Sequence, residues 1–226
     1  MAVIRTLCLV TILGLTAMPV HSEKQQGWRE TFNPDKSALS DTGRSRYFIL
    51  EPGYRLRFAH KKDTLTITVL NETRIVDGVK TRVVEESETS NGEIIEVSRN
   101  YFAIDRTTGD TYYFGEEVDI YKNGKVTSHE GAWLSGENGA RFGLALPGNP
   151  GIGDRYYQEL APKVAMDRAE VVSLTEKLRL PAGAFTDCVR TKETSAIEMG
   201  SGNKWYAPGI GLVRDDDFVL VGVDKP

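Results

Sequence analysis

Six residues have the types and spacing to form a polar strip on one face of a predicted sheet. In a hairpin with a two-residue turn, the flanking residues pair and later pairs keep the same register, so sequence predicts which side chains share a face. Turn dipeptides predict four such hairpins, at Asp77-Gly78, Asn91-Gly92, Thr108-Gly109 and Asn123-Gly124. The shared face carries the candidate ligand-binding residues Glu86, Arg99, Tyr101, Glu116, His129 and Trp133.

The predicted registers place Arg99 between two acids. Arg99 lies diagonal to Glu86 on one side and to Glu116 on the other, and Glu116 lies diagonal to His129. Diagonal separations of ~7–8 Å are within reach of long side chains. A three-residue loop at Thr108-Gly109 would instead move Glu116 and His129 to the outer face.

Charged groups on an otherwise apolar face must be paired or neutralised. The strip is therefore either a structural band of ion pairs or a polar strip inside a ligand cavity. In the second case Arg99 would bind an anionic group, and the apolar walls would hold the rest of the ligand.

Three functions follow from these alternatives. The first is an exported, non-catalytic, barrel-like module that binds an apolar or amphipathic small molecule, or a segment of an envelope protein. The second is a hydrolase that uses Glu86, Glu116 and His129 as acid and base groups. The third is a structural envelope or adhesion module without a pocket.

The sequence offers few parts for metal, cofactor or nucleophile chemistry. Beyond residue 22 it holds two histidines, His60 and His129, and one cysteine, Cys188, so a site of several His or Cys ligands cannot form in one chain. The glycine-rich stretch 148–153 lacks the lysine of a phosphate-binding loop. We therefore assign no catalytic residue, no metal ligand and no cofactor.

The elements that must position the strip are strands. After Pro52-Gly53 the sequence runs in short alternating segments, such as 64–70, which are separated by turn dipeptides. This pattern predicts an all-β fold, an antiparallel meander of roughly ten to twelve strands forming a closed or half-open barrel. We expect one β-rich domain at residues 51–226, preceded by a short irregular or helical arm at 23–50.

The amino-terminal residues have the layout of a secretory signal peptide. One positive charge in residues 1–5 precedes an apolar run at 6–17 and a small residue at Ser22, so we expect a signal peptide at 1–22. The apolar run is shorter than the ~20 residues that span a bilayer. The sequence thus predicts export to the periplasm or the medium, without a membrane span.

The charge of the chain argues against two classes of partner. The formal net charge is −4, with 28 Lys and Arg against 32 Asp and Glu. A mildly acidic chain without a Lys/Arg cluster has no electrostatic footprint for nucleic acid or for anionic lipid.

Several turn motifs carry a resemblance to a protein group. The segment 205–213 contains YAPGIGLV, and Pro52-Gly53, Gly153-Asp154 and the run 181–185 (PAGAF) accompany it. Over Glu51 to Val213 the chain resembles a group of uncharacterised exported bacterial β-proteins with a C-terminal YAPGxGLV segment. A weaker, fold-level likeness is to the half-barrels of periplasmic lipoprotein carriers. The resemblance implies a β fold and brings no site residues with it.

Overall fold

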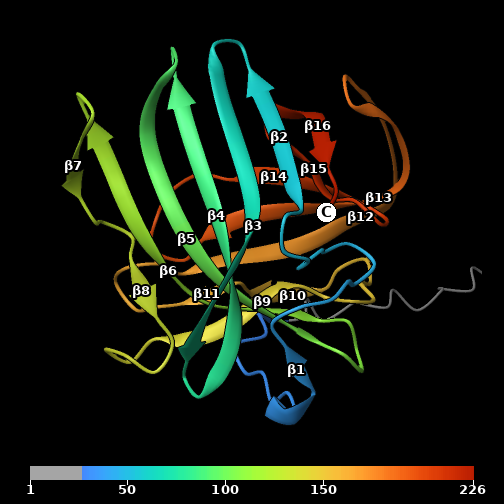
Figure 1. The fold of residues 1–226 in the computed structure, drawn as a ribbon. Helices are drawn as coiled ribbons and strands as arrows, with labels where there is room; N and C mark the ends of the chain where they lie inside the picture. Colours follow the sequence, from blue (N-terminus) through green and yellow to red (C-terminus); the bar gives the residue numbers. More distant parts are fainter. Residues whose placement is uncertain (1–26) are drawn as a thin grey trace, which may run out of the picture.

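A computed structural model of the protein describes residues 27–226. The predicted signal peptide and its boundary after Ser22 lie outside the described residues. Within residues 27–226 the chain forms one short 3-10 turn and a 16-stranded antiparallel sheet, curled into a nearly closed barrel (Figure 1). The predicted all-β antiparallel barrel is confirmed, and the count exceeds the predicted strands because several strands are only two or three residues long.

The elements follow one another along the chain as alternating hairpin strands. In order they are η1 (Lys36–Ala38), β1 (Leu39–Ser40), β2 (Arg55–His60), β3 (Asp63–Val76), β4 (Val79–Ser90), β5 (Glu93–Asp105), β6 (Thr111–Lys122), β7 (Lys125–Ser128), β8 (Trp133–Leu134), β9 (Arg141–Leu146), β10 (Arg155–Tyr157), β11 (Glu159–Leu160), β12 (Asp167–Leu180), β13 (Gly183–Ser195), β14 (Gly202–Ala207), β15 (Gly211–Asp215) and β16 (Phe218–Asp224).

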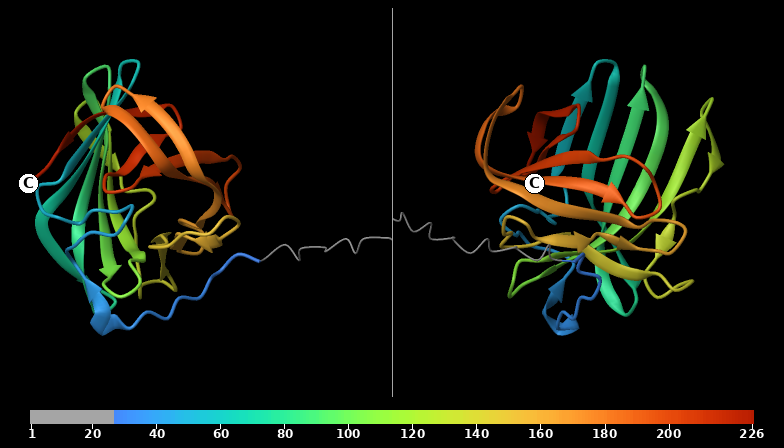
Figure 2. Two further views of the ribbon diagram at one scale, coloured as in Figure 1. Left: turned by 90° about the vertical axis from the view of Figure 1, so that its right-hand side faces the viewer. Right: turned by 180° about the vertical axis from the view of Figure 1, so that it is seen from behind.

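The last strand joins the two halves of the sheet. The order is β10-β12-β13-β14-β15-β16-β2-β3-β4-β5-β6-β9-β11, so β16 pairs with β2. Strands β2–β6, cyan to green, form one wall of the barrel, and strands β12–β16, orange to red, form the facing wall (Figure 2). Side chains from both ends of the sequence therefore meet in the interior.

Three of the four predicted turns are confirmed. Asp77, Asn91 and Asn123 have φ of 48°, 52° and 54°, and each is followed by a glycine with positive φ, as a two-residue hairpin turn requires. The predicted turn at Thr108-Gly109 is wrong. The nearest strand pair is Ile104↔Thr111, and the Asp105 carboxylate caps a wider loop by accepting hydrogen bonds from the N–H groups of Thr107 and Thr108.

Two single-residue bulges change the register around β5. Between β4 and β5 the pairing passes from Thr89↔Ile94 to Glu88↔Glu96, so Ile95 is the extra residue. Between β5 and β6 the extra residue lies next to Gly115, whose φ is 134°. A Cβ atom there would come within 2.3 Å of the Trp133 carbonyl oxygen, so the second bulge requires glycine.

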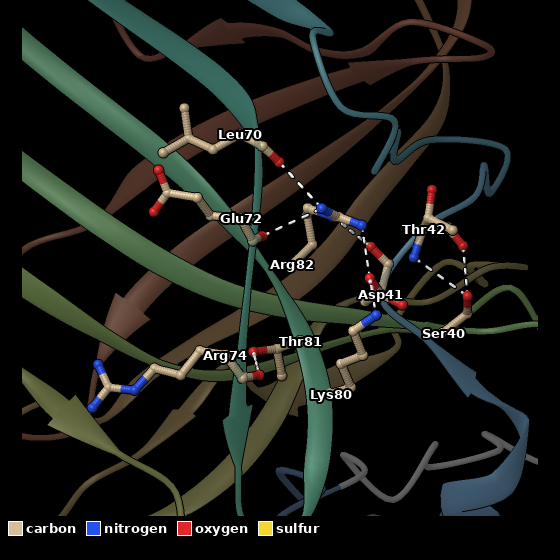
Figure 3. Close-up of polar contacts among 9 residues, drawn as sticks. All are labelled: Ser40, Asp41, Thr42, Leu70, Glu72, Arg74, Lys80, Thr81 and Arg82. Carbon is tan, nitrogen blue, oxygen red and sulfur yellow. Dashed lines mark hydrogen bonds and ion pairs between the residues drawn. The ribbon is translucent and has the colours of Figure 1, made fainter.

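A third irregularity, in β3, is held by the side chain of Arg82 (Figure 3). Its guanidinium donates hydrogen bonds to the carbonyl oxygens of Leu70 and Glu72, at 3.4 and 3.3 Å, where the β3–β4 pairing is interrupted. It also bonds the backbone carbonyl and the carboxylate of Asp41, at 2.8 and 2.7 Å. Because Asp41 belongs to the segment before β2, Arg82 ties that segment to the sheet.

Strands β4, β5 and β6 carry buried residues on both faces. Val84, Phe102 and Tyr113 belong to the hydrophobic cluster inside the barrel. Alternate residues of the same strands pack in a second cluster, which Phe32 from the amino-terminal segment covers, with its ring 6.2 Å from that of Tyr112. Among residues 27–226 no helix is long and apolar enough to cross a membrane.

Replacement of Arg82 tests the role of this clamp. We expect Arg82→Met to lower the free energy of unfolding by about 3–5 kcal/mol, because it leaves the half-buried Asp41 carboxylate and two carbonyl groups without their main donor. Arg99→Met is the matched control, since the Arg99 side chain is 39% exposed and its ion pairs are worth less than about 1 kcal/mol. Urea unfolding followed by tryptophan fluorescence measures both, and equal losses would contradict the assignment.

Candidate functional site

The interior of the barrel contains a cavity of about 260 Å³ between the two walls. One part of its lining is apolar and comes from the amino-terminal segment, from β2–β5 and from the loop before β15. The residues of this part that bear on the argument are Phe48, Leu56, Ile67, Val69, Val84 and Phe102. The rest of the lining is polar and strongly acidic.

The bulges place the polar residues of the first wall. Glu86 of β4 lies opposite Ser98, and Asn100 lies opposite Glu116 of β6. All four side chains line the cavity. The Tyr113 hydroxyl donates a hydrogen bond to the Asn100 side-chain oxygen, and the Asn100 amide donates to Ser98 Oγ at 3.1 Å. These bonds fix the neutral polar groups and leave the carboxyl groups to face the interior.

The facing wall supplies a lysine that is already paired. Lys204 Nζ lies 3.1 Å from Glu193 Oε2 and 3.8 Å from Asp215 Oδ2. Gln158 Nε2 donates a hydrogen bond to Glu193 Oε1 at 3.1 Å. The Lys204 ammonium thus neutralises part of the charge of its own wall.

Acidic side chains far outnumber basic ones around the cavity. Within the described part of the chain, Lys204 is the one basic residue of the lining. Seven acids line the cavity with it, namely Glu86, Glu96, Glu116, Glu159, Asp167, Glu193 and Asp215. The first five of these form no ion pair with any residue in the range 27–226, so the cavity carries an excess of negative charge whenever they are ionised.

Burial raises the pKa of several of these carboxyl groups. It raises the pKa of Glu86 to about 7, with Lys204 acting in the opposite direction. Burial also raises the pKa of Glu116 to about 7, against the lowering effect of the neighbouring Tyr113 hydroxyl. Burial raises the pKa of Glu159 well above its usual range, and the nearby Glu116 carboxyl raises it further. Glu86 and Glu116 therefore exchange protons near neutral pH.

The structure places Glu86 and Glu116 in the cavity lining, but the predicted position of Arg99 is wrong. The bulge at Ile95 turns Arg99 to the opposite face, where its guanidinium lies 3.4 Å from Glu85 and 3.6 Å from Asp119. An anion-binding arginine between the two acids is therefore absent from this cavity lining among the described residues.

The other three predicted site residues also lie outside the lining. His129 is 70% exposed, and its Nδ1 lies 3.0 Å from Asp119 Oδ1 and 2.8 Å from the Val118 carbonyl oxygen. Tyr101 packs in the second cluster, and its hydroxyl donates a hydrogen bond to Glu117. Trp133 packs edge-on against Tyr113, with ring centroids 5.4 Å apart. Since His129 is on the other face, the predicted hydrolase arrangement of Glu86, Glu116 and His129 is not assembled.

Sequence reasoning missed most of the polar lining. The sequence of β5 shows a polar residue at every second position, namely Glu96, Ser98 and Asn100. The register predicted from the turns assigned these residues to the outer face. Glu193 and Lys204 come from the facing wall, and local residue patterns do not show how that wall aligns with the first. Only the pairing of β16 with β2 brings these distant strands opposite Glu86.

Comparison with known proteins adds a distant likeness. No protein-family model matches the sequence, and no curated protein matches it. A solved structure that does match is described as that of "a putative lipoprotein" from Parabacteroides distasonis ATCC 8503. It is 12% identical, with a TM-score of 0.40, and the match covers 81% of this chain and 100% of that chain. A likeness at this level identifies no function for this chain.

The raised pKa values predict that the protein is more stable in mild acid than in mild alkali. Glu86 and Glu116 have a pKa of about 7 when folded, against 4.5 for an ordinary glutamate. Between these values the folded chain binds more protons than the unfolded chain, so the free energy of unfolding falls as pH rises. We expect a loss of about 2–4 kcal/mol between about pH 5 and pH 8.

Urea unfolding at a series of pH values measures this loss. Glu86→Gln/Glu116→Gln should reduce the pH dependence and leave the part that comes from Glu159. The matched control Glu85→Gln/Glu117→Gln changes the neighbouring outward residues and should keep the pH dependence of the wild type. The hydrogen bond from Arg74 lowers the pKa of Glu117, so this carboxyl group does not titrate between about pH 5 and pH 8. Stability that rises between about pH 5 and pH 8 would contradict the assignment.

Proposed function

We propose that this chain is an exported, non-catalytic binding module that holds an amphipathic small molecule inside its barrel. The observation that carries the proposal is the cavity of about 260 Å³, which is lined by both apolar and polar side chains. Small-molecule sites are typically concave and largely apolar, with a few polar groups that orient the ligand. The export part of the proposal rests on the signal-peptide pattern at residues 1–22.

The alternatives have less support. A structural module would be expected to fill its core, because empty space in a core costs stability. A hydrolase that used Glu86 and Glu116 with His129 would need the imidazole near the carboxyl groups, and His129 is bonded to Asp119 on the outer face.

A cavity-filling variant tests the proposal. N-phenyl-1-naphthylamine is an uncharged probe that fluoresces in apolar surroundings. We expect the wild-type protein to bind it saturably, and Ile67→Trp to weaken binding at least about tenfold, or 1.4 kcal/mol, by occupying the apolar part of the cavity. Fluorescence titration measures the dissociation constant.

Thr66→Trp is the matched control. Thr66 is the preceding residue of β3, and its side chain points to the opposite face of the sheet. The Thr66→Trp variant should bind the probe as tightly as the wild type does. The proposal fails if the wild type does not bind, or if both variants lose binding equally. Native mass spectrometry of protein from its own host would then identify any molecule that co-purifies.

A further inference from the structure

The charge of the cavity lining restricts which ligand it can take. Five carboxyl groups, from both walls, line the cavity without forming an ion pair with any of residues 27–226, and Arg99, the expected anion-binding group, lies on the other face. An anionic head group would meet repulsion from Glu86, Glu116 and their neighbours. A cationic head group would supply the missing counter-charge in surroundings where charge interactions are strong.

Lys204 shows that an ammonium group fits this environment. Its Nζ atom is held between the carboxylates of Glu193 and Asp215, at 3.1 and 3.8 Å. Glu86 and Glu116 present the same chemical groups on the facing wall, without such a partner. A second ammonium group placed there would repeat an arrangement that the protein already contains.

The side chain of Tyr206 is a second, independent sign of a missing partner. Tyr206 is 7% exposed and lines the cavity, and Glu193, Lys204, Asp215 and Glu86 all act electrostatically on its hydroxyl group. No residue in the described range 27–226 forms a hydrogen bond with that hydroxyl. Tyr206 lines the cavity, and its hydroxyl oxygen can accept a hydrogen bond from an ammonium group.

A surface hollow lies next to the acidic part of the cavity. Four residues, Asp167, Glu193, Lys204 and Asp215, line both the cavity and a hollow of about 300 Å³ beside the β13–β14 loop. That hollow adds the acids Glu198 and Asp216 and no further basic residue from the described part of the chain. A negatively charged surface next to the cavity attracts cations and raises their association rate.

The acids are too dispersed for a bare metal ion. Within residues 27–226 no three His, Cys, Asp or Glu side chains come together in a way that could hold one. Groups spread over several strands are better matched by an organic cation, whose charge is carried on a larger body that also contacts the apolar wall.

We propose that the cavity takes amphiphiles with a cationic head group, of the alkylammonium class, with the ammonium group between Glu86, Glu116 and Tyr206 and the alkyl chain against the apolar wall. This inference rests on the proposed function, since it names the ligand class of the same cavity. Ligand binding would release protons from the cavity, because an ammonium group favours the ionised form of the carboxyl groups.

Three ligands that share one alkyl chain test the inference. Octylamine, 1-octanol and octanoate are titrated into the full mature protein at about pH 7, where the amine is charged and Glu86 and Glu116 are partly protonated. We expect octylamine to bind at least about tenfold more tightly than 1-octanol, and octanoate to bind more weakly than 1-octanol. Isothermal titration calorimetry in buffers of different ionisation enthalpy should also show proton release with octylamine alone.

Paired variants locate the effect. Glu86→Gln/Glu116→Gln should reduce the affinity for octylamine to that for 1-octanol and leave 1-octanol unchanged. The control Glu85→Gln/Glu117→Gln, which alters the adjacent outward-facing acids, should keep the preference for the amine. A preference for the amine that survives in the first variant would overturn the inference, because the amine would then bind elsewhere.

The two proposals fail in different ways. Equal binding of octylamine and 1-octanol, or tightest binding of octanoate, overturns the cationic ligand class and leaves the binding function intact. If none of the three ligands binds and N-phenyl-1-naphthylamine does not bind either, the binding function itself is wrong.

Discussion

Side chains alternate between the two faces of a strand, so one extra residue exchanges the inward and outward sets. The bulge at Ile95 applies this constraint to β5, and it turns Asn100 inward and Arg99 outward. With Arg99 inside, its guanidinium would neutralise the neighbouring carboxylates. Because it is outside, the first wall presents acids and neutral amide or hydroxyl groups, and this single insertion makes the cavity more negative.

The second bulge restores the original orientation one strand later. At Gly115 the chain again gains a residue, so Glu116 faces the cavity although Phe114 packs in the opposite cluster. The backbone there approaches the Trp133 carbonyl too closely for any Cβ atom. The inward position of Glu116 therefore depends on Gly115, a residue that has no side chain to take part in the chemistry of the cavity.

This pair of bulges also explains what the sequence could predict. Asp-Gly and Asn-Gly dipeptides predicted three turns, since they need positive φ, and alternation predicted the strands and the barrel. Glu86 precedes both bulges, and Glu116 follows both, so the two shifts cancel and both acids face inward as predicted. Arg99 and Tyr101 lie between the bulges and were assigned to the wrong face. A bulge leaves no clear mark in residue types, and the closure of β16 on β2 depends on the whole sheet, so Lys204 could not be placed.

Carboxyl groups without counter-ions are an unfavourable way to line a barrel, because apolar residues of similar volume would stabilise the fold. The fold tolerates them because its central strands are packed on both faces and the Arg82 clamp holds the amino-terminal segment in place. On the ligand class proposed above, a ligand that supplies positive charge would recover the free energy that charge repulsion removes from the fold. Ligand charge and pH therefore act on one equilibrium: protonation and cation binding are two ways to neutralise the same groups, and each must weaken the other.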